Sequence, residues 1–241
     1  MFFLQTYFVV TPNDALPDDY DAPTVYMEYA VGRDGFLLRH KSAKNHRGGI
    51  MGICLQSAAS PREELLLSDI LDECNRRQYH GIFLAGNELP QVIPDLLRRQ
   101  DQFPVYLPNE WASGNLIGIL DTALSGGSLR EYLAEYSYGK NALYVAKNFV
   151  DFALPAENGE GHLLSEKEFR QLYKKYAAQT YFSRELCAHY FTYIDDHRAH
   201  FVLFDNIQSI QEKLFLGAQF CFPIAFLPYS LYPLEKKKDG P

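Results

Sequence analysis

Acidic and amide side chains follow several short apolar segments of this chain, where a protein can place carboxylates for acid–base chemistry. The segment YHGIFLAGNELP carries Asn87 and Glu88 near its end, and two further apolar segments end in Asp121 and Asp205. Hydrolysis of a glycosidic bond uses two carboxyl groups, about 5–5.5 Å apart for retention and about 6.5–9.5 Å apart for inversion. The sequence therefore offers Glu88, paired with Asp121 or Asp205, as candidate catalytic carboxylates.

Each of these carboxylates also has a structural interpretation that needs no catalysis. Glu88 lies just before a helical pattern, where a negative charge interacts favourably with the helix dipole. Asp121 could accept hydrogen bonds from turn amides. Asp205, together with Asn206, could cap the helix that follows. The sequence alone leaves these alternatives open.

A second group of side chains could hold a ligand without transforming it. Aromatic rings near the ends of apolar segments can stack on a sugar, and amide or carboxylate groups can hydrogen-bond to it. The candidates are Asn87, Glu110, Trp111, Asn148 and Tyr229, with Glu28 in a similar position. We expect most of the 17 Tyr and 17 Phe to fill the core.

The spacing of cysteine and histidine indicates neither a metal nor a cofactor site. The four cysteines lie far apart without a CxxC pair, and the seven histidines form no HExxH pattern. SGGS before a helical pattern lacks the P-loop lysine, so we expect a loop leading into a helix cap. We also expect buried, reduced thiols at Cys54, Cys74 and Cys221, and solvent-facing imidazoles at His189, His197 and His200.

The charge and hydropathy of the chain limit the kinds of partner that we expect it to bind. The formal net charge is −7 and the basic run is confined to residues 236–238, so we expect no nucleic-acid surface. No apolar run approaches the roughly 20 residues that span a membrane. The first ten residues lack the basic region and the cleavage site of a signal peptide. We therefore expect a cytoplasmic protein without membrane contact.

Apolar segments alternate with helical patterns along most of the chain. Capping boxes mark two helix starts, Ser60 with Glu63 and Ser165 with Glu168. Eight apolar segments joined mostly by helices predict a parallel sheet that closes into a slightly shortened TIM (β/α)8 barrel of the α/β class. The predicted strands span residues 2–10, 24–31, 48–55, 80–86, 103–108, 115–121, 141–149 and 220–227.

A small α+β insertion is predicted late in the barrel, at about residues 150–200. The segments HYFTY and HFVLFD, joined by a polar turn, have the pattern of a β-hairpin. The whole chain, residues 1–241, is predicted to form a single barrel domain that ends in a disordered tail at residues 235–241.

The second half of the chain carries an ordered series of motifs. VDFALP ends a predicted strand, LLSEKEF opens a helix, YFTYIDDHRAHFVLFDN contains the hairpin, and SIQEKLFL precedes the last strand. This order, over residues 140–227, resembles the spore-associated bacterial members of glycoside hydrolase family 18. The resemblance implies a TIM barrel with a late α+β insertion.

That family places its catalytic acid after the fourth strand, in the pattern Asp-Gly-x-x-x-Asp-x-Glu. Aligned on the shared glycine, this chain has His80, Ala85 and Asn87 at the three acidic positions. The tyrosine that the family pattern places just before Asp121 is absent, and so is the tryptophan of the last strand. The resemblance therefore implies the architecture of the family without its activity.

The sequence is compatible with three hypotheses about function. The leading hypothesis is a catalytically degenerate family 18-like protein that binds a glycan or peptidoglycan-like ligand at the barrel mouth. The first alternative is an active glycosidase with relocated carboxylates, Glu88 with Asp121 or Asp205. The second is a structural or interaction protein of a bacterial spore or cell envelope.

Overall fold

The computed structural model describes residues 4–32, 34–55, 63–86, 92–155, 161–177 and 179–232. The chain divides into two compact units. The barrel unit comprises Gln5–Leu120, Lys140–Tyr144 and Pro223–Pro241, and the insertion unit comprises Met1–Leu4, Asp121–Gly139 and Val145–Phe222. The expected tail at residues 235–241 and the expected helix start at Ser60 lie outside the described residues.

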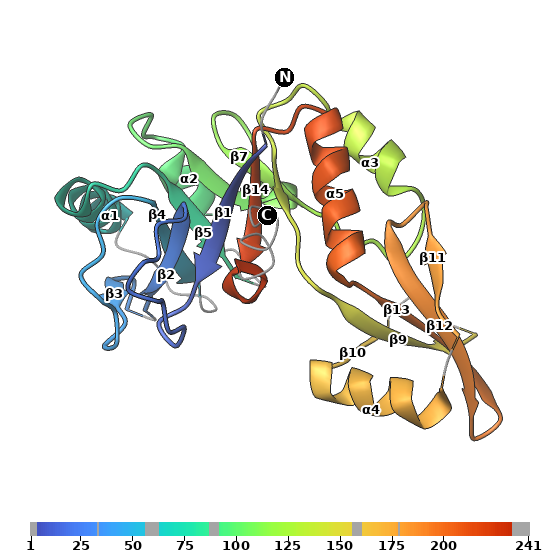
Figure 1. The fold of residues 1–241 in the computed structure, drawn as a ribbon. Coiled ribbons are helices and arrows are strands. Elements are labelled where there is room, and N and C mark those ends of the chain that lie inside the picture. Colours follow the sequence, from blue (N-terminus) through green and yellow to red (C-terminus); the bar gives the residue numbers. More distant parts are fainter. Residues whose placement is uncertain are drawn as a thin grey trace. The chain divides into compact units, whose positions relative to one another are not determined.

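Eight parallel strands close into a barrel, which confirms the predicted fold class (Figure 1). The pairing runs in sequence order around the barrel, and the last strand returns to the first, with Gln5 opposite Ile224. The strands are β1 (Gln5–Val10), β2 (Thr24–Val31), β4 (Ile50–Leu55), β5 (Ile82–Ala85), β6 (Val105–Pro108), β7 (Ile117–Asp121), β8 (Ala142–Tyr144) and β14 (Ile224–Pro228).

Short elements connect several of these strands. Helix α1 (Glu63–Arg77) follows β4, and helix α2 (Val92–Leu97) follows β5. Single 3₁₀ turns, η1 (Asn109–Trp111) and η2 (Tyr229–Leu231), follow β6 and β14. An antiparallel strand β3 (Leu37–Arg39) extends the sheet beside β2 and was not predicted, since three residues are too short to show an alternating pattern.

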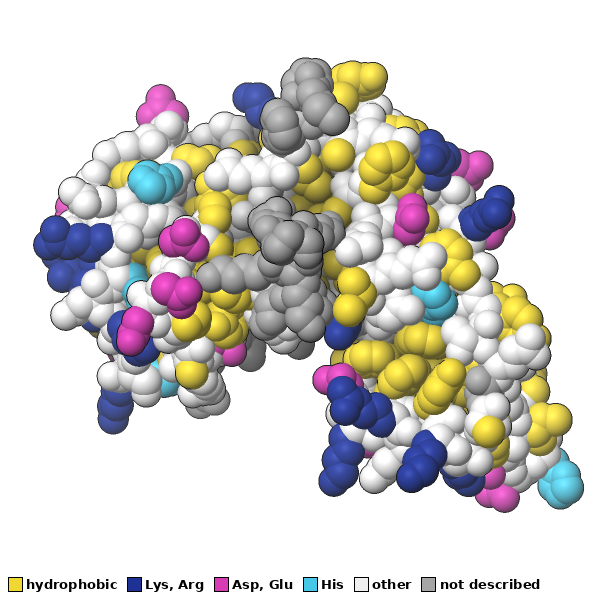
Figure 2. Space-filling view, viewed as in Figure 1, with side chains coloured by type: hydrophobic (Ala, Val, Ile, Leu, Met, Phe, Trp, Pro, Cys, Tyr) yellow, Lys and Arg dark blue, Asp and Glu magenta, His cyan; other side chains and the backbone are white. Residues whose placement is uncertain are grey.

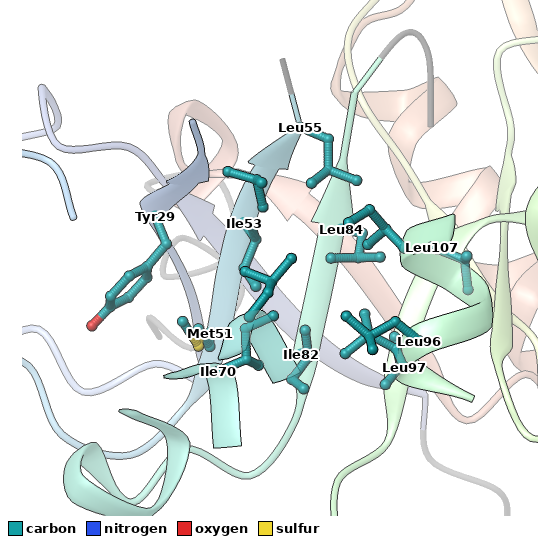
Figure 3. Packing of buried hydrophobic residues seen from close by; sticks show 14 of the residues in the cluster. Tyr29, Met51, Ile53, Leu55, Ile70, Ile82, Leu84, Leu96, Leu97 and Leu107 are labelled. Atoms are coloured by element: carbon teal, nitrogen blue, oxygen red, sulfur yellow. The ribbon is translucent and has the colours of Figure 1, made fainter. Parts of the chain in front are cut away.

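The outward side of the strands packs against α1 and α2 (Figure 3). Met51, Ile53 and Ile82 point to this side and are fully buried. They join Ile70 of α1 and Leu96 of α2 in one hydrophobic cluster. Truncating a buried aliphatic side chain of this kind costs about 2–5 kcal/mol. The cluster therefore fixes β4 and β5, the third and fourth strands of the barrel.

The inward side of the strands fills the barrel with side chains. Phe83, Tyr106 and Phe226 are nearly fully buried. The ring of Phe226 lies 4.9 Å from that of Phe83 and 5.2 Å from that of Tyr106, edge to face in both pairs. This interior is a packed core, as is usual for the fold. A ligand of the barrel therefore has to bind beyond the strand ends.

The insertion unit contains a five-stranded antiparallel sheet. The predicted hairpin is present, and both turn residues, Asp196 and His197, have positive φ angles, which suit the twist of a tight hairpin. In spatial order the strands are β10 (His162–Leu163), β9 (Phe149–Leu154), β13 (Arg198–Phe204), β12 (Ala188–Asp195) and β11 (Tyr181–Ser183).

Three helices accompany this sheet: α3 (Leu129–Glu135), α4 (Glu166–Tyr176) and α5 (Ile207–Gln219). The predicted capping box of α4 is confirmed. Ser165 Oγ accepts from the Glu168 N–H at 3.2 Å, and the Glu168 carboxylate accepts from the Ser165 N–H at 2.7 Å. Ser128 caps α3, as expected for the SGGS segment.

The two faces of the insertion sheet bury different clusters. On the face that we call the α4 face, Phe191 and Val202 pack with Phe169 of α4. On the opposite face, Phe152 and Leu203 pack with Leu124. Strand alternation assigns every residue of the sheet to one of these faces.

Two expectations about burial are wrong. Cys54 is exposed, because it lies on the inward side of β4 one residue before the strand ends. His189 is buried between the rings of Phe182 and Phe204, because it points to the α4 face. The prediction for Cys74, a buried thiol, is confirmed, and Cys221 is partly buried.

Candidate functional site

The end of β5 is the strand end on which the family resemblance places the catalytic acid. Ala85 packs with Phe83 in the inward cluster, so its side chain is on the inward side of the strand. A residue on this side at a strand end is where a barrel enzyme carries a catalytic group. Asn87 and Glu88 lie outside the described residues, and their roles stay predictions.

Asp121 is the last residue of β7 and continues the alternation of Ile117 and Ile119, which face inward. Its Oδ1 accepts a hydrogen bond from the Ala123 N–H at 2.8 Å, so the expected contact with a turn amide is present. Burial of the carboxyl raises the pKa of Asp121, although the residue keeps exposed surface. The Ala123 N–H and the Lys213 ammonium oppose this shift, and the Asp205 carboxylate adds to it.

Asp205 is buried, and each of its carboxylate oxygens accepts a hydrogen bond. Its Oδ1 accepts from Lys213 Nζ at 2.7 Å, and its Oδ2 accepts from the Asn148 N–H at 3.3 Å. Lys213 is only 1% exposed. The Asn148 carbonyl in turn accepts from the Asp205 N–H at 2.9 Å. This geometry favours a structural role for Asp205, because both carboxylate oxygens already have donors.

The cap of α5 is Asn206 and not its neighbour Asp205. Asn206 Oδ1 accepts from the Ser209 N–H at 3.0 Å, and Ser209 Oγ accepts from the Asn206 N–H at 2.8 Å. The cap fixes the first turn of α5, which in turn places Lys213 opposite Asp205. The cap and the ion pair therefore hold the same helix to the end of β13.

A small cavity adjoins this ion pair within the insertion unit. Asn148, Asp205 and Lys213 provide its polar wall, and Phe152 and Leu203 provide part of its apolar wall. Its volume is about 40 Å³. That volume holds a few water molecules, since one water needs about 10–15 Å³ on this measure. A sugar ring does not fit, so the cavity is not a substrate pocket.

The other candidate ligand residues belong to the barrel unit. Trp111 packs against the outward hydrophobic cluster, whereas Glu110 beside it is exposed. Tyr229 donates its hydroxyl proton to the Ala15 carbonyl at 3.1 Å, and its ring stacks on that of Tyr232. Trp111 and Tyr229 therefore have structural contacts, and their ligand-binding roles stay predictions.

Glu28 does not lie at a strand end, contrary to expectation. It lies inside β2 and is buried. Its carboxylate accepts from Arg39 at 3.3 Å and from the Lys44 N–H at 3.2 Å, with His46 Nε2 3.6 Å away. The side chain thus ties the segment after β3 to β2.

The structure brings three of the predicted residues together, namely Asp121, Asn148 and Asp205, and adds Lys213, which was missed. A lysine eight residues after an aspartate, inside the apolar pattern of IQSIQEKLFL, was the available signal. Among the described residues, no group of three His, Cys, Asp or Glu side chains could hold a metal ion. No helix in the described ranges has the length and hydropathy needed to cross a membrane.

Comparison with known proteins identifies the fold. No family model and no curated protein sequence matches the chain. The spore cortex-lytic enzyme SleL of Bacillus cereus is similar over 95% of this chain and 71% of its own, with 12% identity and a TM-score of 0.62. A chitinase of Chromobacterium violaceum is similar over 93% of each chain, with 11% identity and a TM-score of 0.58.

A third structure, human YKL-39, is described as a pseudo-chitinase with retained chitooligosaccharide binding. It is similar over 93% of this chain and 92% of its own, with 9% identity and a TM-score of 0.62. At these identities the similarity shows the fold. The chain is a TIM barrel with an additional antiparallel sheet, and its fold is similar to the folds of these three proteins.

Proposed function

We propose that the protein is a non-hydrolytic family 18-like barrel that binds a chitin- or peptidoglycan-like glycan at the C-terminal ends of the barrel strands. The observation that carries this proposal is Ala85, whose methyl group occupies the inward position at the end of β5. The family resemblance puts the inner aspartate of the catalytic motif at this position.

The chemistry of the family explains why a methyl group matters there. The proton donor needs a raised pKa, and the N-acetyl group that attacks in place of an enzyme nucleophile needs a carboxylate to orient it. Ala85 supplies neither a charge nor a hydrogen-bond acceptor. The contacts of Asp205 support a structural role over a catalytic one, because Lys213 and Asn148 each donate a hydrogen bond to one of its oxygens.

Binding of a glycan has separate support. The similar structures include both hydrolases and human YKL-39, whose description combines lost chitinase status with retained oligosaccharide binding. Asp121 is exposed on the inward side of β7, so it can accept hydrogen bonds from sugar hydroxyl or amide groups.

The test is calorimetric titration with chitohexaose and with muropeptides, combined with chromatography of the same mixtures after long incubation. We expect saturable binding of one of these glycans without release of shorter products. Asp121→Asn should weaken binding about fivefold or more, since a charged hydrogen-bond acceptor is lost. Asp72→Asn, which changes an exposed carboxylate on α1, is the control and should leave affinity unchanged. Absence of binding, or release of shorter glycans, would refute the proposal.

One observation favours the alternative of an active glycosidase with relocated carboxylates. The raised pKa of Asp121 is the property that a general acid requires. In that case Asp121→Asn and Glu88→Gln would each abolish the release of shorter oligosaccharides, with little change in the affinity for chitohexaose.

A further inference from the structure

A polar pocket lies on the outside of the barrel unit, between β3 and α1. Its volume is about 390 Å³, which is within the range of about 300–1,000 Å³ that is usual for small-ligand sites. It is lined by Tyr29, Leu37 and Arg39 from β2 and β3 and by Asp69, Asp72, Glu73 and Arg76 from α1. Figure 2 shows Lys and Arg side chains gathered where α1 lies beside β3. The pocket is therefore large enough for a small molecule and is lined by charges of both signs.

One ion pair of the pocket is fixed by the protein itself. Glu73 Oε1 accepts from the Tyr29 hydroxyl at 2.6 Å, and Glu73 Oε2 accepts from Arg76 Nε at 2.7 Å. Figure 3 shows the Tyr29 hydroxyl pointing away from the aliphatic side chains of the outward cluster. Burial acts to raise the pKa of Glu73, but the hydrogen bonds from Tyr29 and Arg76 outweigh burial, so the pKa is lowered. Glu73 is therefore an anion that holds the Arg76 guanidinium in the wall of the pocket.

The remaining charges of the pocket are not paired with one another. Arg39 Nη2 donates to the buried Glu28 at 3.3 Å, and Arg39 Nη1 has no hydrogen-bond partner in the described part of the chain. Among the described residues, Asp69 has neither a hydrogen bond nor an ion pair, and Asp72 accepts only from Ser68 Oγ at 3.3 Å. Two carboxylates and a guanidinium therefore line the same pocket without neutralising one another.

We propose that this pocket, which we call the α1–β3 pocket, binds a basic amino acid, a small molecule with one carboxylate and two cationic groups. The carboxylate accepts from Arg39 and Arg76, and charge-assisted hydrogen bonds of this kind are stronger than neutral ones. The cationic groups donate to Asp69 and Asp72. The pocket lies on the outward side of the strands, where Tyr29 packs, so the inference does not rest on glycan binding at the strand ends.

The balance of charges in the α1–β3 pocket selects this class of ligand. Three carboxylates and two guanidiniums line the pocket, so it carries one negative charge in excess, and a basic amino acid carries one positive charge in excess. A purely anionic ligand, such as inorganic phosphate, meets Asp69 and Asp72 as like charges. A simple diamine leaves the free guanidinium donors without an acceptor. A basic amino acid satisfies both kinds of group at once.

The experiment titrates the full chain with L-lysine, norleucine and cadaverine in a calorimeter. Norleucine lacks the side-chain ammonium of lysine, and cadaverine lacks its carboxylate. We expect saturable binding of lysine, with a Kd at least about tenfold lower than the Kd of either analogue, because each analogue loses a charge-assisted hydrogen bond. Equal Kd values for the three compounds would overturn the inference.

Two sets of variants test the two walls separately, and both change exposed side chains, so the fold is preserved. Asp69→Asn combined with Asp72→Asn should raise the Kd for lysine about fivefold or more. Glu64→Gln, which changes an exposed carboxylate of α1 outside the pocket, is the matched control and should leave this Kd unchanged.

Arg76→Gln removes one guanidinium from the pocket. It should raise the Kd for lysine and for norleucine about fivefold, and it should change the Kd for cadaverine less than about twofold, because cadaverine has no carboxylate. Arg99→Gln, outside the pocket, is its control. An equal change for all three compounds would show that Arg76 does not contact a carboxylate and would contradict the proposed orientation.

Two further outcomes would also overturn the inference. The first is the absence of saturable lysine binding by the unchanged protein, and the second is lysine binding that the variants of both walls leave unchanged. Neither outcome affects the proposed function, because glycan binding at the strand ends is measured with chitohexaose and muropeptides. A protein that binds lysine but no glycan would retain the α1–β3 pocket and lose the proposed function.

Discussion

The end of β5 and the cluster around Asp205 differ in chemistry, although both lie where a strand ends. At the end of β5 the inward residue is Ala85, packed with Phe83 in an apolar cluster. At the end of β13 the buried residue is a carboxylate with an ammonium and an amide N–H as partners. A carboxylate that serves only catalysis can be replaced by a small apolar residue without loss of stability. A carboxylate buried with a partner cannot, because the partner is left charged in an apolar environment.

The largest effect is expected when this buried pair is broken. Lys213→Met leaves the Asp205 carboxylate buried without its ammonium partner and should lower the free energy of unfolding by about 3–5 kcal/mol. Chemical denaturation measures this value. The double variant Lys213→Met with Asp205→Leu should recover much of the loss, since no buried charge remains. A loss under about 1 kcal/mol in the single variant would show that the pair is not the support described here.

The converse change places a carboxylate at the end of β5. Ala85→Asp puts a charge without a described partner against the inward cluster, and we expect a loss of about 1–3 kcal/mol in the free energy of unfolding. We also expect no hydrolysis of chitohexaose, because the neighbouring positions of the motif remain His80 and Asn87. Release of shorter sugars by this variant would mean that the remaining groups of the site are intact.

A smaller effect is expected at the cap of α5. Asn206→Ala removes the side-chain acceptor of the Ser209 N–H and should cost about 0.5–2 kcal/mol. Ser165→Ala at the exposed cap of α4 is the comparison, and it should cost less, because α4 has no buried residue. Equal losses in thermal unfolding would show that α5 is no more tightly held than α4.

The smallest effect concerns Asp121. Burial raises its folded-state pKa, so its contribution to stability is full below about pH 3.8, the usual value, and is lost as the pH rises through the raised pKa. Asp121→Asn stays neutral and should match the unchanged protein below that pH. At pH 7 it should be more stable by at most about 0.5 kcal/mol, because solvent screens an exposed residue. If Asp121→Asn is less stable than the unchanged protein at pH 7, this prediction is wrong.

Local sequence patterns predict much of the fold, but they predict only part of the candidate site. Apolar runs bounded by turn residues predicted all eight barrel strands, and Ser165 with Glu168 predicted the start of α4. Sequence could not show that Lys213 is buried, because a lysine in an amphipathic pattern usually faces solvent. The pair is revealed only by the 2.7 Å between Lys213 Nζ and Asp205 Oδ1 in the structure. It also could not show that Cys54 is exposed, since a strand end and a strand centre have the same composition.

The pairing of β1 with β14 has a consequence for how the chain reaches its native state. Gln5 and Ile224 are partners in the closing ladder, although they are separated by almost the whole sequence. Contacts of such long range slow folding, because a large loop must be closed before they contribute any stability. Until β14 is in place, β1 and β8 each keep an unpaired edge. Intermediates that lack this strand are therefore exposed to aggregation until the barrel closes.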